Sequence, residues 1–259
     1  MEKKFTFINE TVIVEDKTLY RIKALRDFGF IKAGDLGGFI ENEDNLSHEG
    51  LCWVYDNARV YDDAKISDNA RVRNFATVRG NAMVCDDARI GESAIVEQNV
   101  YVGCKACIVG TSYVTGHAEV LEYALVEGNA YITDNAYVSD NAMVTGNAKL
   151  YNNCIVCNDA EVGGDVVMFD NASISTDGMV YNNTDYACIH VYNYEYDDME
   201  CEVYVTFYKL KGDEGTIVTD FEGKIYNLDE FRTMIDEKYS GELNIRFKDA
   251  AHAAEQTIR

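Results

Sequence analysis

The sequence predicts a mainly β protein built on a left-handed parallel β-helix of triangular section. From Leu51 to Asn182 the chain divides into 22 consecutive hexads. The fourth position is Val, Ile, Leu or Met in all 22, the second is Ala in 16, and Asn or Asp opens 15. A period of six matches no face of an α-helix, so the repeat indicates short strands rather than helices.

Each hexad position has a physical reason. Side chains alternate along a strand, so positions two and four point to the same side and form the core. The second residue must be small because three strands converge on a narrow axis. Positions six and one form a corner, where Asp, Asn and Gly tolerate the turn conformation. Three hexads make one coil of 18 residues, which predicts about seven coils and a prism roughly 35 Å long.

One outward face of this prism carries an unusually apolar row. Apolar rows of this length are typical of contact with another subunit or domain. A closed homo-oligomer is the preferred prediction, and the alternative is that the C-terminal tail folds back over the row. The predicted interface ladder consists of Ile95, Tyr113, Tyr131 and Val167, with Tyr151 and Phe169 beside them.

The flanks of the repeat differ from it in composition. Residues 1–44 are expected to form a β-rich cap, residues 45–188 the β-helix, and residues 189–259 a small α+β domain. A cap is expected because the open end of a β-helix exposes both core and backbone. The predicted strands of the cap are residues 5–8, 11–14 and 19–22.

The C-terminal segment predicts both strands and helices. Asn227 with Glu230 three residues later is a typical helix N-terminus, and the helix should end near Gly241. The remaining predicted elements are strands at 203–208, 215–219 and 242–247, and a last helix at 249–258.

The charge of the chain limits its partners. With 45 acidic and 23 basic residues the net charge is −22, which disfavours direct binding of nucleic acid or an anionic membrane. A basic protein partner is compatible with it, including one that itself binds nucleic acid. Imitation of DNA over the whole prism would need roughly 20 net negative charges. Residues 45–188 carry a net −12, so only a partial acidic patch would fit.

Targeting and metal signals are weak. The first residues contain no apolar run of signal-peptide length, and no apolar stretch is long enough to span a membrane, so cytoplasm is expected. Cys104 and Cys107, and Cys154 and Cys157, have the spacing of a zinc or redox pair. The repeat phase puts Cys154 inside the prism and Cys157 outside. We therefore expect free thiols and no metal site.

The segments before the repeat resemble a known family. Residues 21–28, 32–41 and 45–47 are similar to the N-terminal cap of bacterial and prophage hexapeptide-repeat proteins. Residues 206–231 resemble a C-terminal module of the same group. Members are often labelled acyltransferases, largely because of their fold. The resemblance implies a left-handed β-helix, commonly trimeric, of bacterial or phage origin, and in the latter case located in the host cytoplasm.

The resemblance raises an enzymatic alternative. His117 is the one histidine inside the coils, and it could act as a general base oriented by Glu119. However, no insertion interrupts the hexads, the chain has no proline, and no phosphate-binding glycine motif is visible. The sequence therefore favours a non-catalytic protein-interaction scaffold without a cofactor, for example an inhibitor of a host nucleic-acid-handling or defence protein. The alternative is an acyltransferase that uses acetyl-CoA.

Overall fold

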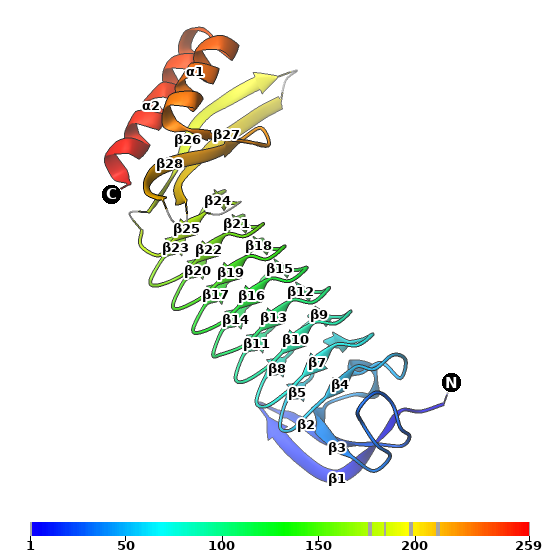
Figure 1. Ribbon diagram of the computed structural model, residues 1–259. Coiled ribbons are helices and arrows are strands. Elements are labelled where there is room, and N and C mark those ends of the chain that lie inside the picture. Colours follow the sequence, from blue (N-terminus) through cyan, green and yellow to red (C-terminus); the bar gives the residue numbers. More distant parts are fainter. Residues whose placement is uncertain (1, 176–177, 184, 197–198, 211–212, 259) are drawn as a thin grey trace.

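The structure, a computed structural model, describes residues 2–175, 178–183, 185–196, 199–210 and 213–258. It confirms the predicted fold class, a mainly β chain whose centre is a parallel β-helix of triangular section. An N-terminal β hairpin continues one side of the helix (Figure 1). A four-stranded antiparallel sheet with two α-helices lies at the other end (Figure 1).

Three sheets form the sides of the prism, and we call them faces 1, 2 and 3. Face 1 contains, in spatial order, β1 (Phe5–Val14), β2 (Lys17–Ala24), β3 (Leu36–Ile40), β5 (Arg59–Val60), β8 (Thr77–Val78), β11 (Ile95–Val96), β14 (Tyr113–Val114), β17 (Tyr131–Ile132), β20 (Lys149–Leu150) and β23 (Val167–Met168). Face 2 contains β4 (Trp53–Val54), β7 (Arg71–Val72), β10 (Arg89–Ile90), β13 (Cys107–Ile108), β16 (Leu125–Val126), β19 (Met143–Val144), β22 (Glu161–Val162) and β25 (Met179–Val180). Face 3 contains β6 (Lys65–Ile66), β9 (Met83–Val84), β12 (Tyr101–Val102), β15 (Glu119–Val120), β18 (Tyr137–Val138), β21 (Ile155–Val156) and β24 (Ser173–Ile174).

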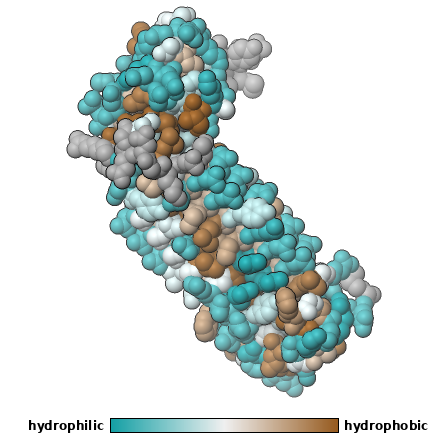
Figure 2. All heavy atoms as spheres, in the orientation of Figure 1, coloured by the Kyte–Doolittle hydropathy of each residue, from teal (hydrophilic) through white to brown (hydrophobic). Residues whose placement is uncertain are grey.

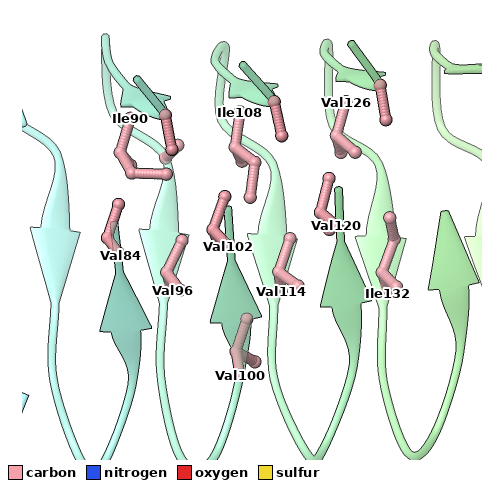
Figure 3. Packing of buried hydrophobic residues seen from close by; sticks show 14 of the residues in the cluster. Val84, Ile90, Val96, Val100, Val102, Ile108, Val114, Val120, Val126 and Ile132 are labelled. Carbon is pink, nitrogen blue, oxygen red and sulfur yellow. The ribbon is translucent and has the colours of Figure 1, made fainter. Parts of the chain in front are cut away.

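The predicted core positions are confirmed. Strands pair in parallel with partners 18 residues apart, as in Val114 with Ile132. Every fourth-position residue from Val54 to Val180 is buried, and so are the alanines at position two. Figure 3 shows the result, in which Val and Ile side chains from all three faces point to the axis and stack turn upon turn.

The corners explain why Asn and Asp recur. Corner residues such as Asp134 have a positive φ, which Asp, Asn and Gly tolerate best. The carboxylate of Asp134 accepts the backbone N–H of Asn152 in the next turn at 2.8 Å. At the following position, Asn135 Nδ2 donates to Asn153 Oδ1 at 3.0 Å. At these two corner positions, a side chain therefore bonds to the equivalent residue one turn later.

The prism has about eight turns, one more than the hexads indicate. In the first turn Phe39 pairs with Arg59, and Leu46 forms a bridge with Ile66. These partners are 20 residues apart instead of 18, so the periodic pattern does not include them. The 3₁₀ turn η1 (Glu43–Asn45) lies in this turn. β3 lies before residue 45 and already pairs with β5 of the prism.

The N-terminal hairpin closes the first turn. The predicted strands 5–8 and 11–14 form a single strand, β1, with a register shift between Phe7 and Thr11. The outward side chain of Trp53 is fully buried, with Phe28 at 5.3 Å between ring centroids. Lys4 is also buried, and its Nζ donates to the carbonyl oxygen of Cys52 at 3.0 Å.

The C-terminal sheet closes the other end. It consists of β26 (Tyr186–Tyr196), β27 (Met199–Leu210), β28 (Asp213–Phe221) and β29 (Lys224–Asn227). Tyr208 is buried on the last turn, where its hydroxyl lies 3.1 Å from Ser175 Oγ. An ion pair of 3.0 Å joins Lys209 to Asp185. Burial opposes the charge of Asp185, but hydrogen bonds from Lys209 and two backbone N–H groups lower its pKa below the usual value.

The two helices cover the side of the four-stranded sheet that lies opposite Tyr208 and the prism (Figure 1). They are α1 (Leu228–Lys238) and α2 (Gly241–Thr257). The capping box of Asn227 and Glu230 is confirmed, and strands β27 and β28 cover the predicted segments 203–208 and 215–219.

The predicted strand at 242–247 is wrong, because these residues form the first turns of α2. Leu243, Ile245 and Phe247 alternate in a short window, which suggested a strand. Over the longer window, Phe247, Ala250, Ala251 and Ala254 are buried. Their spacing of three and four residues is that of a helical face.

The substitution Val138→Asp tests the assignment that the fourth residue of each hexad points into the prism. Val138 is fully buried, so the substitution would place an unpaired carboxylate in the core and cost several kcal/mol, on the order of 3–5. We expect insoluble protein or a large loss in thermal melting temperature. Met83→Asp is the control, because Met83 is 47% exposed on the same face. Equal melting of both variants would contradict the assigned phase.

Candidate interaction face

The structure brings all six predicted ladder residues onto face 1. Ile95, Tyr113, Tyr131 and Val167 lie in β11, β14, β17 and β23, which belong to one sheet. Tyr151 and Phe169 follow β20 and β23 directly. All six side chains are partly or largely solvent-exposed. The sequence pattern therefore located six residues of one outer face, on which Lys149 of β20 lies between Tyr131 and Val167.

Three tyrosines form the centre of this surface. The rings of Tyr113 and Tyr131 are parallel within 3°, with centroids 5.5 Å apart. Tyr151 continues the stack at 5.7 Å from Tyr131, tilted by 44°. Such offset stacking is favourable beyond the burial of area. We call Tyr113, Tyr131 and Tyr151 the tyrosine stack.

A charged network beside the stack holds its first ring. Glu97 is only 8% exposed, and its carboxylate accepts a hydrogen bond from the Tyr113 hydroxyl. Arg79 Nε donates to the same carboxylate at 2.5 Å. Arg79 also pairs with Glu15 of the N-terminal hairpin at 2.5 Å and donates to Tyr61 at 3.0 Å. Tyr113 is therefore fixed by a network that reaches the cap.

The sequence analysis missed this network. Tyr61, Arg79 and Glu97 all occupy position five of their hexads at intervals of 18, so a charge ladder could have been found from the repeat. Glu15 is 64 residues from Arg79, and no periodic signal connects them. Burial raises the pKa of Tyr113, and the negative charge of Glu97 raises it further. Burial opposes the charge of Arg79, yet hydrogen bonds with Tyr61 and Glu97 raise its pKa above the ordinary value.

A cavity lies at the C-terminal end of the ladder. Its volume is about 430 Å³, and it lies between the last turns of face 1, β26 and α2. Among the residues that the structure describes, the tail borders the ladder at Val167 and Phe169, and the domain lies beyond the last turn of the prism (Figure 1). The alternative in which the tail covers the whole row does not describe this structure. Residues of the wall include Val167, Phe169, Tyr186, Ile189, Ala253 and Thr257.

The predicted catalytic pair is not assembled in the described part of the chain. His117 is exposed at a corner, and its Nε2 lies 3.1 Å from Asn99 Nδ2. Glu119 is exposed on face 3, between Tyr101 and Tyr137. Among the residues described, no hydrogen bond or ion pair joins His117 to Glu119. The ring of His117 contacts the amide of Asn99 in the corner ladder.

The C-x-x-C pairs behave as the repeat phase predicts. Cys154 is fully buried and Cys157 is partly exposed. Burial raises the pKa of the Cys154 thiol to about 12, so it stays protonated at neutral pH. Within the described residues, one cluster of possible metal-ligating side chains has its ligand atoms within 4.8 Å of one another. It consists of Asp68, Cys85 and Asp86. Its carboxylates already accept hydrogen bonds in the corner stack, as Asp86 does from Cys104 N–H at 2.8 Å.

No family model matches the chain, and no curated protein does either. The resemblance to prophage hexapeptide-repeat proteins therefore stays a prediction. The fold defines the class: a parallel β-solenoid with a small α+β domain at its end. No helix in the part described is both long and apolar enough to cross a membrane.

Glu97→Gln tests the network through the titration of Tyr113. The neutral amide removes the negative charge that disfavours the phenolate, so the pKa of Tyr113 should fall toward its ordinary value of 10.0. The measurement is an NMR titration with ¹³Cζ-labelled tyrosine, assigned with Tyr113→Phe. Glu119→Gln, on face 3, should leave the Tyr113 signal unchanged. An identical titration in Glu97→Gln and wild type would mean that this contact is absent in solution.

Proposed function

We propose that this protein is a non-catalytic scaffold that binds a basic protein partner along face 1. The observation that carries the proposal is the partly exposed tyrosine stack on an uninterrupted prism. Tyrosine is enriched at the centres of protein interfaces, where it supplies a large contact area. Its side chain has few rotatable bonds, so ordering it on binding costs little entropy.

The stack is prepared for binding before a partner arrives. Tyr113 is held by Glu97, and Tyr131 is stacked between Tyr113 and Tyr151. Neighbouring turns are fixed by backbone hydrogen bonds, such as Tyr113 N–H to Ala130 at 2.8 Å. A rigid surface loses less conformational entropy on association than a mobile loop does. This rigidity supports a role in recognition.

Charge supports a basic partner. Residues 106–188 contain eleven acids and one base, Lys149. Exposed Asp134 and Asp170 lie at the corner of face 1, on turns that carry the ladder. Tyrosine rings bind arginine through cation–π contacts, and nearby carboxylates add to the attraction. A partner with a basic surface fits best, and proteins that handle nucleic acid have such surfaces. Inhibition of one of these, in a bacterial host, is the specific role that we propose.

The scaffold proposal is preferred over the acyl-CoA alternative for two reasons. The hydrogen bond of His117 goes to the corner ladder, not to Glu119. The strands from β4 to β24 succeed one another at regular intervals of six residues, so no loop leaves the prism to form a substrate cleft there.

Partner capture tests the proposed face. The full chain is used to capture proteins from a bacterial lysate, and each captured protein is then purified and its dissociation constant measured. Tyr131→Ser should weaken binding of the true partner about tenfold or more, as for an interface anchor. Tyr123→Ser is the matched control, because Tyr123 is 57% exposed but lies at another corner. Equal affinity of both variants would assign the partner to another surface and refute the proposal.

Calorimetry with acetyl-CoA separates the scaffold from the transferase. The scaffold proposal predicts no detectable heat of binding at millimolar acetyl-CoA. Saturable binding, together with acyl transfer that is lost in His117→Ala, would overturn it in favour of the enzyme. Asn99→Ala is the control, because it removes the contact of His117 without removing the imidazole.

A further inference from the structure

We propose that face 2 binds an acidic, extended segment of a partner protein through Arg71, Arg73 and Arg89. Arg71 and Arg89 lie in β7 and β10, and Arg73 directly follows β7. We call these three residues the arginine patch. The ligand that fits it is a pair of carboxylates separated by one residue in an extended chain. The patch lies on a different face from the tyrosine stack, so the inference does not depend on the proposed function.

The fold gathers the three positive charges in a small area. Arg71 and Arg89 are directly paired in adjacent strands, which are about 4.8 Å apart. Arg73 is two residues after Arg71, so it lies on the same side of the chain, about 7 Å away. Gly91 leaves room for it, because a Cβ at Gly91 would lie 3.3 Å from Arg73 Cγ. Like charges that face each other across adjacent strands are unfavourable, and an anion between them would relieve the repulsion.

The chain itself does not neutralise the arginine patch. Within the part of the chain that the structure describes, none of the three guanidinium groups forms an ion pair or a hydrogen bond. Corner aspartates of the same turns have other partners. Asp62 forms an ion pair with Lys17, and Asp86 accepts the Cys104 N–H at 2.8 Å. A bound carboxylate would therefore meet arginines that have no competing acid.

The arginine patch is accessible, and a tyrosine borders it. Arg73 and Arg89 are exposed, and Arg71 and Tyr55 are partly exposed. The guanidinium carbon of Arg73 lies 5.9 Å from the centroid of the Tyr55 ring. Burial raises the pKa of Tyr55, although the positive charges of Arg71 and Arg73 oppose this shift. The phenol thus stays protonated at neutral pH, and its hydroxyl is a hydrogen-bond donor for an anion on the patch.

An apolar strip borders the other side of the patch. Cys107 pairs with Arg89 and with Leu125 in the neighbouring strands, and both are partly exposed, as is Val109. Burial raises the pKa of Cys107, and the charges of Arg89 and Arg73 oppose this shift, so both guanidinium groups lie near the strip. Hydrophobic and hydrophilic side chains form adjoining patches on the prism (Figure 2). An apolar border limits the access of water, which strengthens the attraction between guanidinium and carboxylate groups.

The spacing and the charge of the chain favour an acidic peptide segment over nucleic acid. Guanidinium groups bind carboxylates through two parallel hydrogen bonds. In an extended segment, side chains two residues apart lie on one side at about 7 Å, which matches the separation of Arg71 and Arg73. A nucleic-acid backbone would extend beyond three arginines and meet a chain of net charge −22.

Fluorescence anisotropy with a labelled peptide tests the arginine patch in the full chain. The probe contains four glutamates that alternate with glycines, and we expect saturable binding that weakens as salt is added. Arg71→Gln, Arg73→Gln and Arg89→Gln should each raise the dissociation constant about tenfold or more, because each removes a charged hydrogen-bond donor. The matched control is Arg59→Gln, which removes a partly exposed arginine from β5 on face 1 and should leave the affinity unchanged.

Two further measurements test the geometry of the site. A second peptide carries four glutamates in adjacent pairs, and it should bind more weakly because neighbouring side chains of an extended chain point to opposite sides. Arg89→Lys keeps the charge but loses the planar fork of the guanidinium group, so its affinity should fall between those of wild type and Arg89→Gln. Thermal melting followed by circular dichroism should be the same for all variants, since the substituted side chains are partly or fully exposed.

Four outcomes would overturn the proposal. The first is the absence of saturable binding at millimolar peptide, and the second is an equal affinity of Arg59→Gln and the three face 2 variants. The third is equal binding of both peptides, which would refute the extended register. The fourth is binding of an oligothymidylate of the same charge as tightly as the alternating peptide, which would assign the arginine patch to nucleic acid instead of a protein segment.

Discussion

The whole prism depends on one hydrogen-bond register, in which a backbone N–H donates to a carbonyl 17 residues ahead. Tyr113 N–H to Ala130 and Thr115 N–H to Ile132 are examples, at 2.8 and 2.9 Å. This register places equivalent hexad positions on top of each other, so the core can repeat one small and one branched residue. A residue inserted within a strand would turn the side chains that follow it in that strand to the opposite side. The corners protect the register, because corner carboxylates and amides such as those of Asp134 and Asn135 bond to the next turn.

The same register that stacks the core also stacks the surface. Similar residues fall on each other, which is favourable for tyrosine rings and for asparagine amides. It is unfavourable for arginines such as Arg71 and Arg89, which pair across neighbouring strands. On face 1, a carboxylate balances the positive charge of the arginine within the chain, since Glu97 lies between Arg79 and Tyr113.

A parallel β-helix has two open ends, and this chain closes them by different means. At the start, the antiparallel hairpin extends face 1 and buries Trp53 and Lys4 over the first turn. At the finish, the sheet of the C-terminal domain packs Tyr208 onto the last turn. Both arrangements pair or cover strand edges that would otherwise add further strands. The C-terminal domain also lines the cavity beside Phe169, so the domain that closes the prism also borders the end of face 1.

The sequence by itself determined the prism: its phase, its buried residues, its corners and the six residues that share face 1. It did so because the repeat is local, and one 18-residue register converts sequence spacing into spatial contact. Only the tertiary structure decided what lies outside that register. The first turn uses a 20-residue spacing, Glu15 reaches Arg79 across 64 residues, and Gly241–Thr257 is one helix because its longer buried stripe outweighs a short alternation. The tertiary structure also decided where the C-terminal domain lies at the end of the prism. That position depends on contacts, such as the one between Ser175 and Tyr208, that follow no sequence repeat.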